Sequence, residues 1–252
     1  QEISARIQEE IYYAAFETSC EMAQKFGAHS NFGITRAAEG ILQFDTWGVT
    51  PTNPEKWNAL KEKIKKHGLR NSLVIAIAPT ATIATITGVF ECIEPQVSNL
   101  FKRETLSGDF LQVNRYLINR LKELGLWSQD MRDKIKIADG SVQSIEEIPE
   151  DVRKIFRTVW ELPQRALIDM AAARSPYIDQ SQSLNLFMAT PTIGRLSSMY
   201  LYAWKRGIKT TYYLRSRPAT SIAKTTVDTK KYSDDQAVAC SLENPEICDA
   251  CQ

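Results

Sequence analysis

The apolar residues in the first part of the chain recur at helical spacing. From Ile3 to Phe26 they lie three or four positions apart with charged residues between them, which predicts an amphipathic helix. Residues 27–54 are rich in glycine and proline and are expected to form turns. A second helix is predicted over residues 54–66, because it starts with a proline, which is favoured in a first helical turn, and Gly68 follows as a stop.

A different pattern marks residues 73–88. The apolar run 73–78 is short and ends at a proline, so it predicts a buried strand, and the hydroxyl-rich residues after it predict a turn that enters a helix. A first helical turn offers N–H groups and a favourable dipole to an anion, and the hydroxyls of Thr80 and Thr82 add donors. We interpret this turn as a phosphate site; the alternative is a buried strand followed by a threonine-capped helix without a ligand.

The second half of the chain alternates predicted helices with short predicted strands. Helices are expected over residues 111–124, 149–174 and 197–206, and strands over residues 183–188 and 208–214. A polar insert separates the first two helices. Residues 177–186 carry polar side chains between apolar flanks. Because polar groups inside a protein need partners, we expect this segment to line an interior site or a hydrogen-bonded network.

Composition limits the classes of protein and partner. With 252 residues, 43% of them hydrophobic, the chain can bury a sizeable core as one large domain or two small ones. Its 31 Lys and Arg nearly balance its 30 Asp and Glu, which argues against nucleic acid or an anionic membrane as the main partner. No apolar run approaches the roughly 20 residues of a membrane helix, and there is no basic leader followed by an apolar segment, so we expect a soluble, unexported protein. Because the sequence starts at Gln1 inside a helical pattern, we expect a processed, split or partial product.

The cysteines are few and unevenly spread. An odd, scattered set is no disulfide framework, which favours a reducing compartment such as the cytoplasm. The five are Cys20, Cys92, Cys240, Cys248 and Cys251. Residues 219–252 have little apolar content and are predicted to form a disordered tail after a globular part, residues 1–218.

Cys248 and Cys251 form a CxxC motif, whose two sulfurs can cycle between dithiol and disulfide. Two alternatives stay open: the cysteines have no particular role, or they bind zinc. A closed zinc site needs four ligands, and the tail offers only Cys240 besides this pair, so we expect no metal site. A flexible coil of the ~35 residues from Tyr213 to Cys248 has a reach of roughly 30–35 Å, which spans much of a domain.

Tyr212 and Tyr213 are adjacent in a predicted strand. On a regular strand the two rings point to opposite faces, and such a pair usually has one ring in the core and one at its edge. If the two tyrosines act together, the backbone must bend there, with cations from Lys209 to Arg217 around them.

Taken together, seven stretches resemble the C-terminal third of the large (catalytic) subunit of class I ribonucleotide reductase, and they run in the family's order across nearly the whole chain. They are Gly40–Pro51 (GILQFDTWGVTP), Arg70–Ala84 (RNSLVIAIAPTATIA), Ile93–Pro95, Leu106–Phe110 (LSGDF), Tyr177–Asn185 (YIDQSQSLN), Gly207–Pro218 (GIKTTYYLRSRP) and Cys240–Cys251 (CSLENPEICDAC). The resemblance implies an α/β fold: the C-terminal part of a ten-stranded α/β barrel with outer helices and a disordered C-terminal tail.

The resemblance also implies a role for the threonine-rich turn. In the family, the turn that matches Thr80, Ala81, Thr82 and Ile83 holds the substrate diphosphate. Ile83 departs from the usual pattern, which has a hydroxyl residue there, so one side-chain donor to phosphate is lost while the backbone N–H remains.

The paired tyrosines and the tail cysteines acquire redox roles from the same resemblance. Tyr212 and Tyr213 would relay a radical from a small subunit to an active-site cysteine. Cys248 and Cys251 would re-reduce the active-site disulfide after each turnover and would then be recharged by thioredoxin or glutaredoxin. Cys240 matches a tail position without an assigned role, and neither Cys20 nor Cys92 lies in a matching context.

The function implied is reduction of ribonucleoside diphosphates to deoxyribonucleoside diphosphates for DNA precursor synthesis. The family's thiyl cysteine, specificity site and ATP-binding cone precede the region matched, so ATP and dNTP effectors would bind outside it and no cofactor would bind directly. The implied partners are a metal-containing small subunit, thioredoxin or glutaredoxin, the nucleoside diphosphate and a second large subunit. One alternative is a non-catalytic assembly or binding fragment that needs a separate N-terminal chain. Another is a glycyl radical enzyme, which a CxxC tail without a glycyl-radical loop does not favour.

Overall fold

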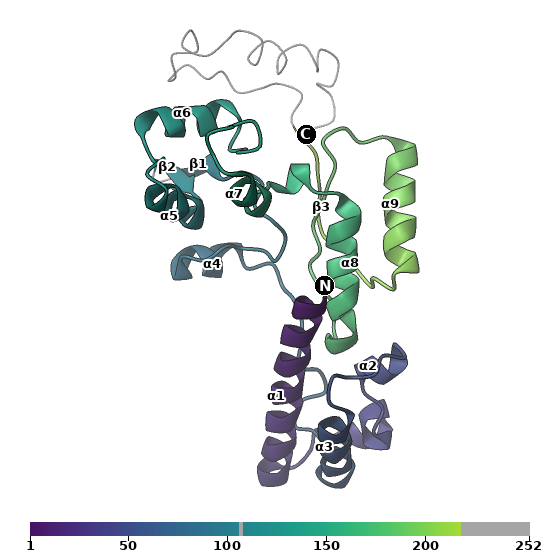
Figure 1. Ribbon diagram of the computed structural model, residues 1–252. Coiled ribbons are helices and arrows are strands. Elements are labelled where there is room, and N and C mark those ends of the chain that lie inside the picture. The colour runs from purple at the N-terminus through teal and green to yellow at the C-terminus, as the bar shows by residue number, and fades with distance from the viewer. Residues whose placement is uncertain (106–107, 218–252) are drawn as a thin grey trace. The chain divides into compact units, whose positions relative to one another are not determined.

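The structure is a computed structural model that describes residues 1–105 and 108–217, with only the backbone described over residues 102–105 and 108–111. The helices (Figure 1) are α1 (Glu2–Phe26), α2 (Gln43–Thr46), α3 (Pro54–His67), α4 (Ala81–Thr87), α5 (Arg115–Glu123), α6 (Gln129–Ile137), α7 (Glu150–Ile155), α8 (Gln164–Arg174) and α9 (Ile193–Lys205). The strands are β1 (Leu100–Thr105), β2 (Gly108–Val113), β3 (Leu186–Phe187) and β4 (Leu214–Arg215). Short 3-10 helices cover Phe32–Ile34, Arg36–Glu39, Val159–Glu161 and Ser175–Tyr177.

The described chain divides into two compact units. The first unit comprises residues 1–82, 164–186 and 192–213. The second unit comprises residues 83–163 and 187–191 and the described residues from Leu214 onward. The assignment of residues 1–218 to one barrel domain stays a prediction.

The core of the first unit confirms the two helices predicted at the start of the chain. One face of α1 buries Tyr12, Phe16 and Cys20 against Trp57, Leu60 and Ile64 of α3. These positions recur four apart on α1 and three or four apart on α3, as expected for two amphipathic helices that share one apolar layer. Asn53 begins α3 by accepting a 3.0 Å hydrogen bond from the N–H of Lys56.

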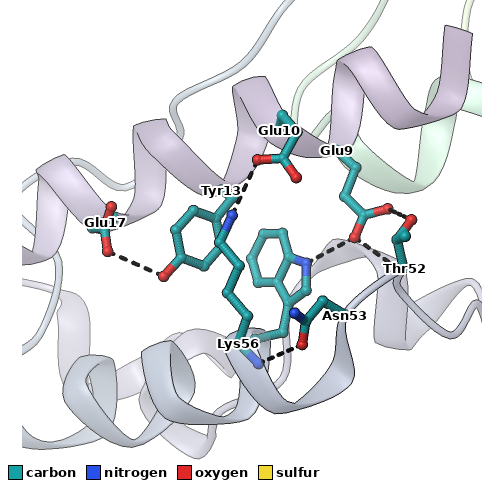
Figure 2. A network of polar contacts seen from close by, with 8 residues as sticks. Glu9, Glu10, Tyr13, Glu17, Thr52, Asn53 and Lys56 are labelled. Carbon is teal, nitrogen blue, oxygen red and sulfur yellow. Dashed lines mark hydrogen bonds and ion pairs between the residues drawn. The ribbon is translucent and has the colours of Figure 1, made fainter. Parts of the chain in front are cut away.

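A buried carboxylate ties α1 to the segment that leads into α3. Glu9 of α1 is 5% exposed. The N–H and hydroxyl of Thr52 donate to it at 2.8 and 2.6 Å, as Figure 2 shows. The indole Nε1 of Trp57 donates to the same carboxylate at 3.0 Å. Nearer the surface, the ammonium of Lys56 pairs with Glu10 at 3.1 Å. These contacts fix the two helices laterally, because an apolar layer alone is not directional.

The second unit combines a β-hairpin with short helices. β1 and β2 are antiparallel, with Leu100 opposite Val113 and Thr105 opposite Gly108. The side-chain amide of Asn99 joins the hairpin base to later loops, since its Nδ2 donates to the carbonyls of Gly140 and Phe156 at 3.0 and 2.8 Å. The core of this unit contains Leu117, Leu121, Met131, Ile135, Val142, Ile145, Ile148 and Val152.

The strand predicted over residues 73–78 is wrong. Named strands do not cover these residues, and within the described chain Ile77 forms only an isolated parallel bridge, to Gln182. Leu73 is 53% exposed, and the other five residues of the run are at best partly buried. An apolar run becomes a buried strand only when neighbours cover it on both sides, and the described residues provide one neighbouring segment.

Other element boundaries also differ from the pattern. The helix predicted from residue 111 begins at Arg115, because residues 108–113 belong to the hairpin, and the polar insert contains α6. The helix predicted from residue 197 begins at Ile193, where the hydroxyl of Thr192 accepts a 3.3 Å hydrogen bond from the N–H of Arg195.

The two late strands are shorter than predicted. β3 lies within the predicted range 183–188, whereas the range 208–214 overlaps β4 only at Leu214. The two strands pair with each other. The ten-stranded closed barrel stays a prediction. Among the described residues, no helix is long and apolar enough to cross a membrane.

Candidate functional site

The segment from Tyr177 to Leu186 joins the two stretches that lead to the candidate site residues. On one side, the N–H of Ile77 donates to Ser181 O at 3.1 Å, and the N–H of Ser183 donates to Ile77 O at 2.7 Å. On the other side, the N–H of Tyr212 donates to Leu184 O at 2.7 Å, and the N–H of Leu186 donates to Tyr213 O at 2.9 Å. The central segment therefore forms backbone ladders with both neighbours, all within the first unit.

Within this segment, the side chain of Gln182 forms a buried hydrogen-bonded network of the predicted kind, whereas Gln180 and Ser181 are exposed. Gln182 is buried, and its Nε2 donates to Ala171 O at 3.0 Å and to the Ser175 hydroxyl at 2.7 Å. Its Oε1 accepts from the buried Arg174 Nε at 2.9 Å. Every polar atom of the Gln182 side chain has a partner, which makes this buried amide compatible with a folded core.

Tyr212 and Tyr213 lie side by side. Their ring centroids are 4.0 Å apart, and the Tyr212 hydroxyl donates to the Tyr213 hydroxyl at 3.1 Å. Neither residue belongs to a named strand, so the alternation that would separate the two rings is absent. The rings are 46% and 49% exposed, which does not fit a pair with one ring in the core and one at its edge. The backbone at these two residues therefore departs from a regular strand, as it must if the two tyrosines act together.

Two of the cations expected around the tyrosines, Lys209 and Arg217, have contacts with other groups. The ammonium of Lys209 donates to three backbone carbonyls of the central segment, and the guanidinium of Arg217 lies 5.1 Å from the ring centroid of Trp160. Sequence reasoning missed the role of Lys209, because a ligand set of main-chain carbonyls leaves no side-chain pattern to recognise.

The threonine-rich turn has the predicted local structure. Thr80 directly precedes α4, and Ala81, Thr82 and Ile83 form the first turn of that helix. The Ile83 side chain is 65% exposed and contributes no hydroxyl at this position. Binding of a diphosphate by these four residues stays a prediction.

The two described cysteines have thiols unsuited to nucleophilic chemistry near neutral pH. Burial raises the pKa of Cys20. Burial, with the charge of Glu94 next in weight, raises the pKa of Cys92 to about 12. A thiol reacts as its thiolate, and the raised pKa disfavours that form at both cysteines. Cys240 and the CxxC pair, Cys248 and Cys251, lie outside the described residues.

The part of the chain that the structure describes contains no group of three or more His, Cys, Asp and Glu that could hold a metal ion. Its architecture is α/β: it combines helices with two short strand pairs and extended ladders, and the ladders lead to candidate site residues. This is the class of protein that the fold defines.

Comparison with known proteins narrows this class to one family. The family description "Ribonucleotide reductase, barrel domain" matches residues 1–214. The large chain of ribonucleoside-diphosphate reductase from Schizosaccharomyces pombe is 42% identical over 100% of this chain and 35% of its own length. The large subunit from Dictyostelium discoideum is 50% identical over 90% of this chain and 26% of its own length.

A solved structure agrees with the sequence matches. The Actinobacillus ureae class Id ribonucleotide reductase alpha subunit has a TM-score of 0.57, at 29% identity, over 83% of this chain and 34% of that chain. The chain belongs to the ribonucleotide reductase barrel-domain family. It spans about a third or less of the length of the curated relatives cited here.

Proposed function

We propose that this chain forms part of the large subunit of a ribonucleoside-diphosphate reductase. In the reaction, the C2′–OH of a ribonucleoside diphosphate is replaced by C2′–H and the oxygen leaves as water. Two thiols supply the two electrons and two protons and become a disulfide. Support comes from the family membership of residues 1–214 and from relatives that carry the name of this activity.

The contact between Tyr212 and Tyr213 is the observation that carries the proposal. A radical can pass between two phenols when a proton and an electron move together, and hydroxyls joined by a 3.1 Å hydrogen bond suit that transfer. We assign the pair to the last part of a radical relay that starts at a metal-containing small subunit.

The other assignments complete the proposed cycle. Thr80, Ala81, Thr82 and Ile83 bind the substrate diphosphate at the start of α4, where helix-terminal N–H groups favour an anion. Cys248 and Cys251 return electrons from thioredoxin or glutaredoxin to the active-site disulfide. The large subunit acts as a homodimer in the cytoplasm, and ATP and dNTP effectors bind outside this segment.

The test replaces each tyrosine of the pair by phenylalanine in a complete large subunit. The change removes one oxidisable O–H and one hydrogen bond, which costs about 1 kcal/mol of stability, and it keeps the ring. We expect Tyr212→Phe and Tyr213→Phe to bind substrate and small subunit normally and to lose nearly all turnover. Retention of more than about a tenth of the activity, a barrier change under ~1.4 kcal/mol, would rule out the relay for that residue.

A further inference from the structure

We propose that Asp179 and Lys209 are positioning residues that hold the diphosphate turn and the tyrosine pair to one common segment. The inference rests on the proposed function for its effect on turnover, but its structural content can be tested separately. Neither residue touches the predicted substrate site or the tyrosine rings in any contact described above; each acts through the backbone that carries those groups.

Asp179 holds the stretch that leads to the diphosphate turn. Its two carboxylate oxygens accept hydrogen bonds from two consecutive N–H groups, Val74 at 2.9 Å and Ile75 at 2.8 Å, across more than 100 residues of sequence. The N–H of Gln180 adds a 3.1 Å bond to Ile75 O. A carboxylate that accepts from two successive backbone donors fixes both the position and the direction of that backbone. Thr80 follows Ile75 by only five residues.

Lys209 holds the stretch that leads to the tyrosine pair. Its ammonium donates to the carbonyl oxygens of Ile178, Asp179 and Gln180 at 3.1, 3.3 and 2.6 Å. An ammonium has three N–H donors, so this set engages as many acceptors as it has protons. Burial lowers the pKa of Lys209, and the nearby charge of Asp179 opposes that change. Tyr212 follows Lys209 by three residues.

The two anchors meet at one point of the chain. The Asp179 side chain binds the stretch before Thr80, and its backbone carbonyl receives the Lys209 ammonium. The ladders described above continue from this point towards Ile77 on one side and Tyr212 on the other. We call the stretch that leads to Thr80 and the stretch that leads to Tyr212 the two arms. Loss of Asp179 or Lys209, the anchors, is expected to loosen only the arm that it holds, because each arm has its own ladder to the central segment.

This arrangement predicts a different kinetic effect for each arm. Asp179→Asn offers an NH₂ group to one of the two N–H donors and loosens the diphosphate turn, so the KM for the nucleoside diphosphate rises about tenfold while kcat changes less than about threefold. Lys209→Met keeps the chain length but removes all three donors, so kcat falls about tenfold while KM changes less than about threefold. Lys209→Arg retains donors that reach the carbonyls and restores at least about half of kcat.

The experiment uses complete large subunit with small subunit, and Thr52→Val serves as the matched control. That change deletes the 2.6 Å hydrogen bond to Glu9 elsewhere in the first unit and leaves Asp179 and Lys209 intact. It therefore shows what a general loss of stability does when both anchors are present. Amide hydrogen exchange gives a readout that does not need activity. We expect faster exchange at Val74 and Ile75 in Asp179→Asn, faster exchange at Tyr212 and Tyr213 in Lys209→Met, and neither change in the control.

The outcomes separate the two proposals. Unchanged exchange at these amides, or equal effects of the two variants on kcat and KM, overturns the positioning role. If Asp179→Asn does not fold, Asp179→Glu keeps the charge but displaces it by one methylene, and the same split in exchange and KM is required. Failure of the proposed function would instead appear as retention of more than about a tenth of the turnover in Tyr212→Phe, and it would leave the exchange results unaffected.

Discussion

Removal of the Glu9 carboxylate should be among the most destabilising single changes in the first unit. Glu9→Ala removes the acceptor of three hydrogen bonds, one from the Trp57 indole and two from Thr52. Trp57 is only 1% exposed. The removal also changes the surroundings of Tyr177, because burial and then the charge of Glu9 raise the pKa of that phenol.

The size of the effect follows from how many of these donors water can reach. Thr52 is exposed and can be hydrated after the change, whereas the Trp57 indole is buried. A buried donor left without an acceptor costs about 1–3 kcal/mol, so Glu9→Ala should cost roughly 2–4 kcal/mol once the lost packing is added. Glu9→Gln keeps one acceptor oxygen and should cost only about 1–2 kcal/mol.

Urea unfolding followed by circular dichroism provides the assay, with Glu10→Ala as the matched control. Glu10 lies next to Glu9 but is in an exposed pair with Lys56, so its removal should change the unfolding free energy by less than about 0.5 kcal/mol. A loss below about 1 kcal/mol for Glu9→Ala, or one no larger than that of the control, would refute the reasoning.

Two further predictions concern pH and the tail. Burial raises the pKa of Tyr12 and Tyr177 above the ordinary value near 10. The folded state therefore holds two phenol protons that the unfolded state releases, so stability is full below about pH 10 and falls above it by up to about 2.7 kcal/mol per pH unit. Tyr12→Phe should halve this slope in alkaline unfolding; an unchanged slope contradicts the assignment. In a complete enzyme, Cys248→Ser or Cys251→Ser should abolish turnover driven by thioredoxin and leave much of that driven by dithiothreitol, whereas equal loss with both reductants would indicate a structural or zinc-binding role.

Helical periodicity predicted the parts of the fold that depend on local sequence. The positions of α1 and α3 follow from apolar spacing and from Pro54, because an amphipathic helix satisfies its own backbone and needs only one covered face. The strand prediction for residues 73–78 failed because a strand, unlike a helix, depends on partners far away in the sequence. The hydrogen bonds of this run go to residues about a hundred positions away, and local hydrophobicity cannot show how many neighbours it has. The hairpin was missed because its first strand, LFKRET, lacks an alternating apolar face.

The candidate site was predictable only where side chains carry the chemistry. The adjacent phenols of Tyr212 and Tyr213 and the hydroxyls of Thr80 and Thr82 stand out in sequence. Whether the two tyrosine rings are in contact depends on the backbone conformation at these residues, which the sequence does not determine. The anchors Asp179 and Lys209 could not be inferred at all, because their partners are main-chain groups that every residue possesses.

The ladder between residues 75–77 and 180–183 also sets the order of events during synthesis. The stretch from Ile75 to Ile77 leaves the ribosome more than 100 residues before Asp179 and its neighbours, a delay of roughly 5–20 s at ordinary elongation rates. During that interval the ladder cannot form, and the apolar run at 73–78 lacks the segment that pairs with it. The backbone of Tyr212 and Tyr213 joins the central segment later still, so these ladders are among the last parts of the first unit to form.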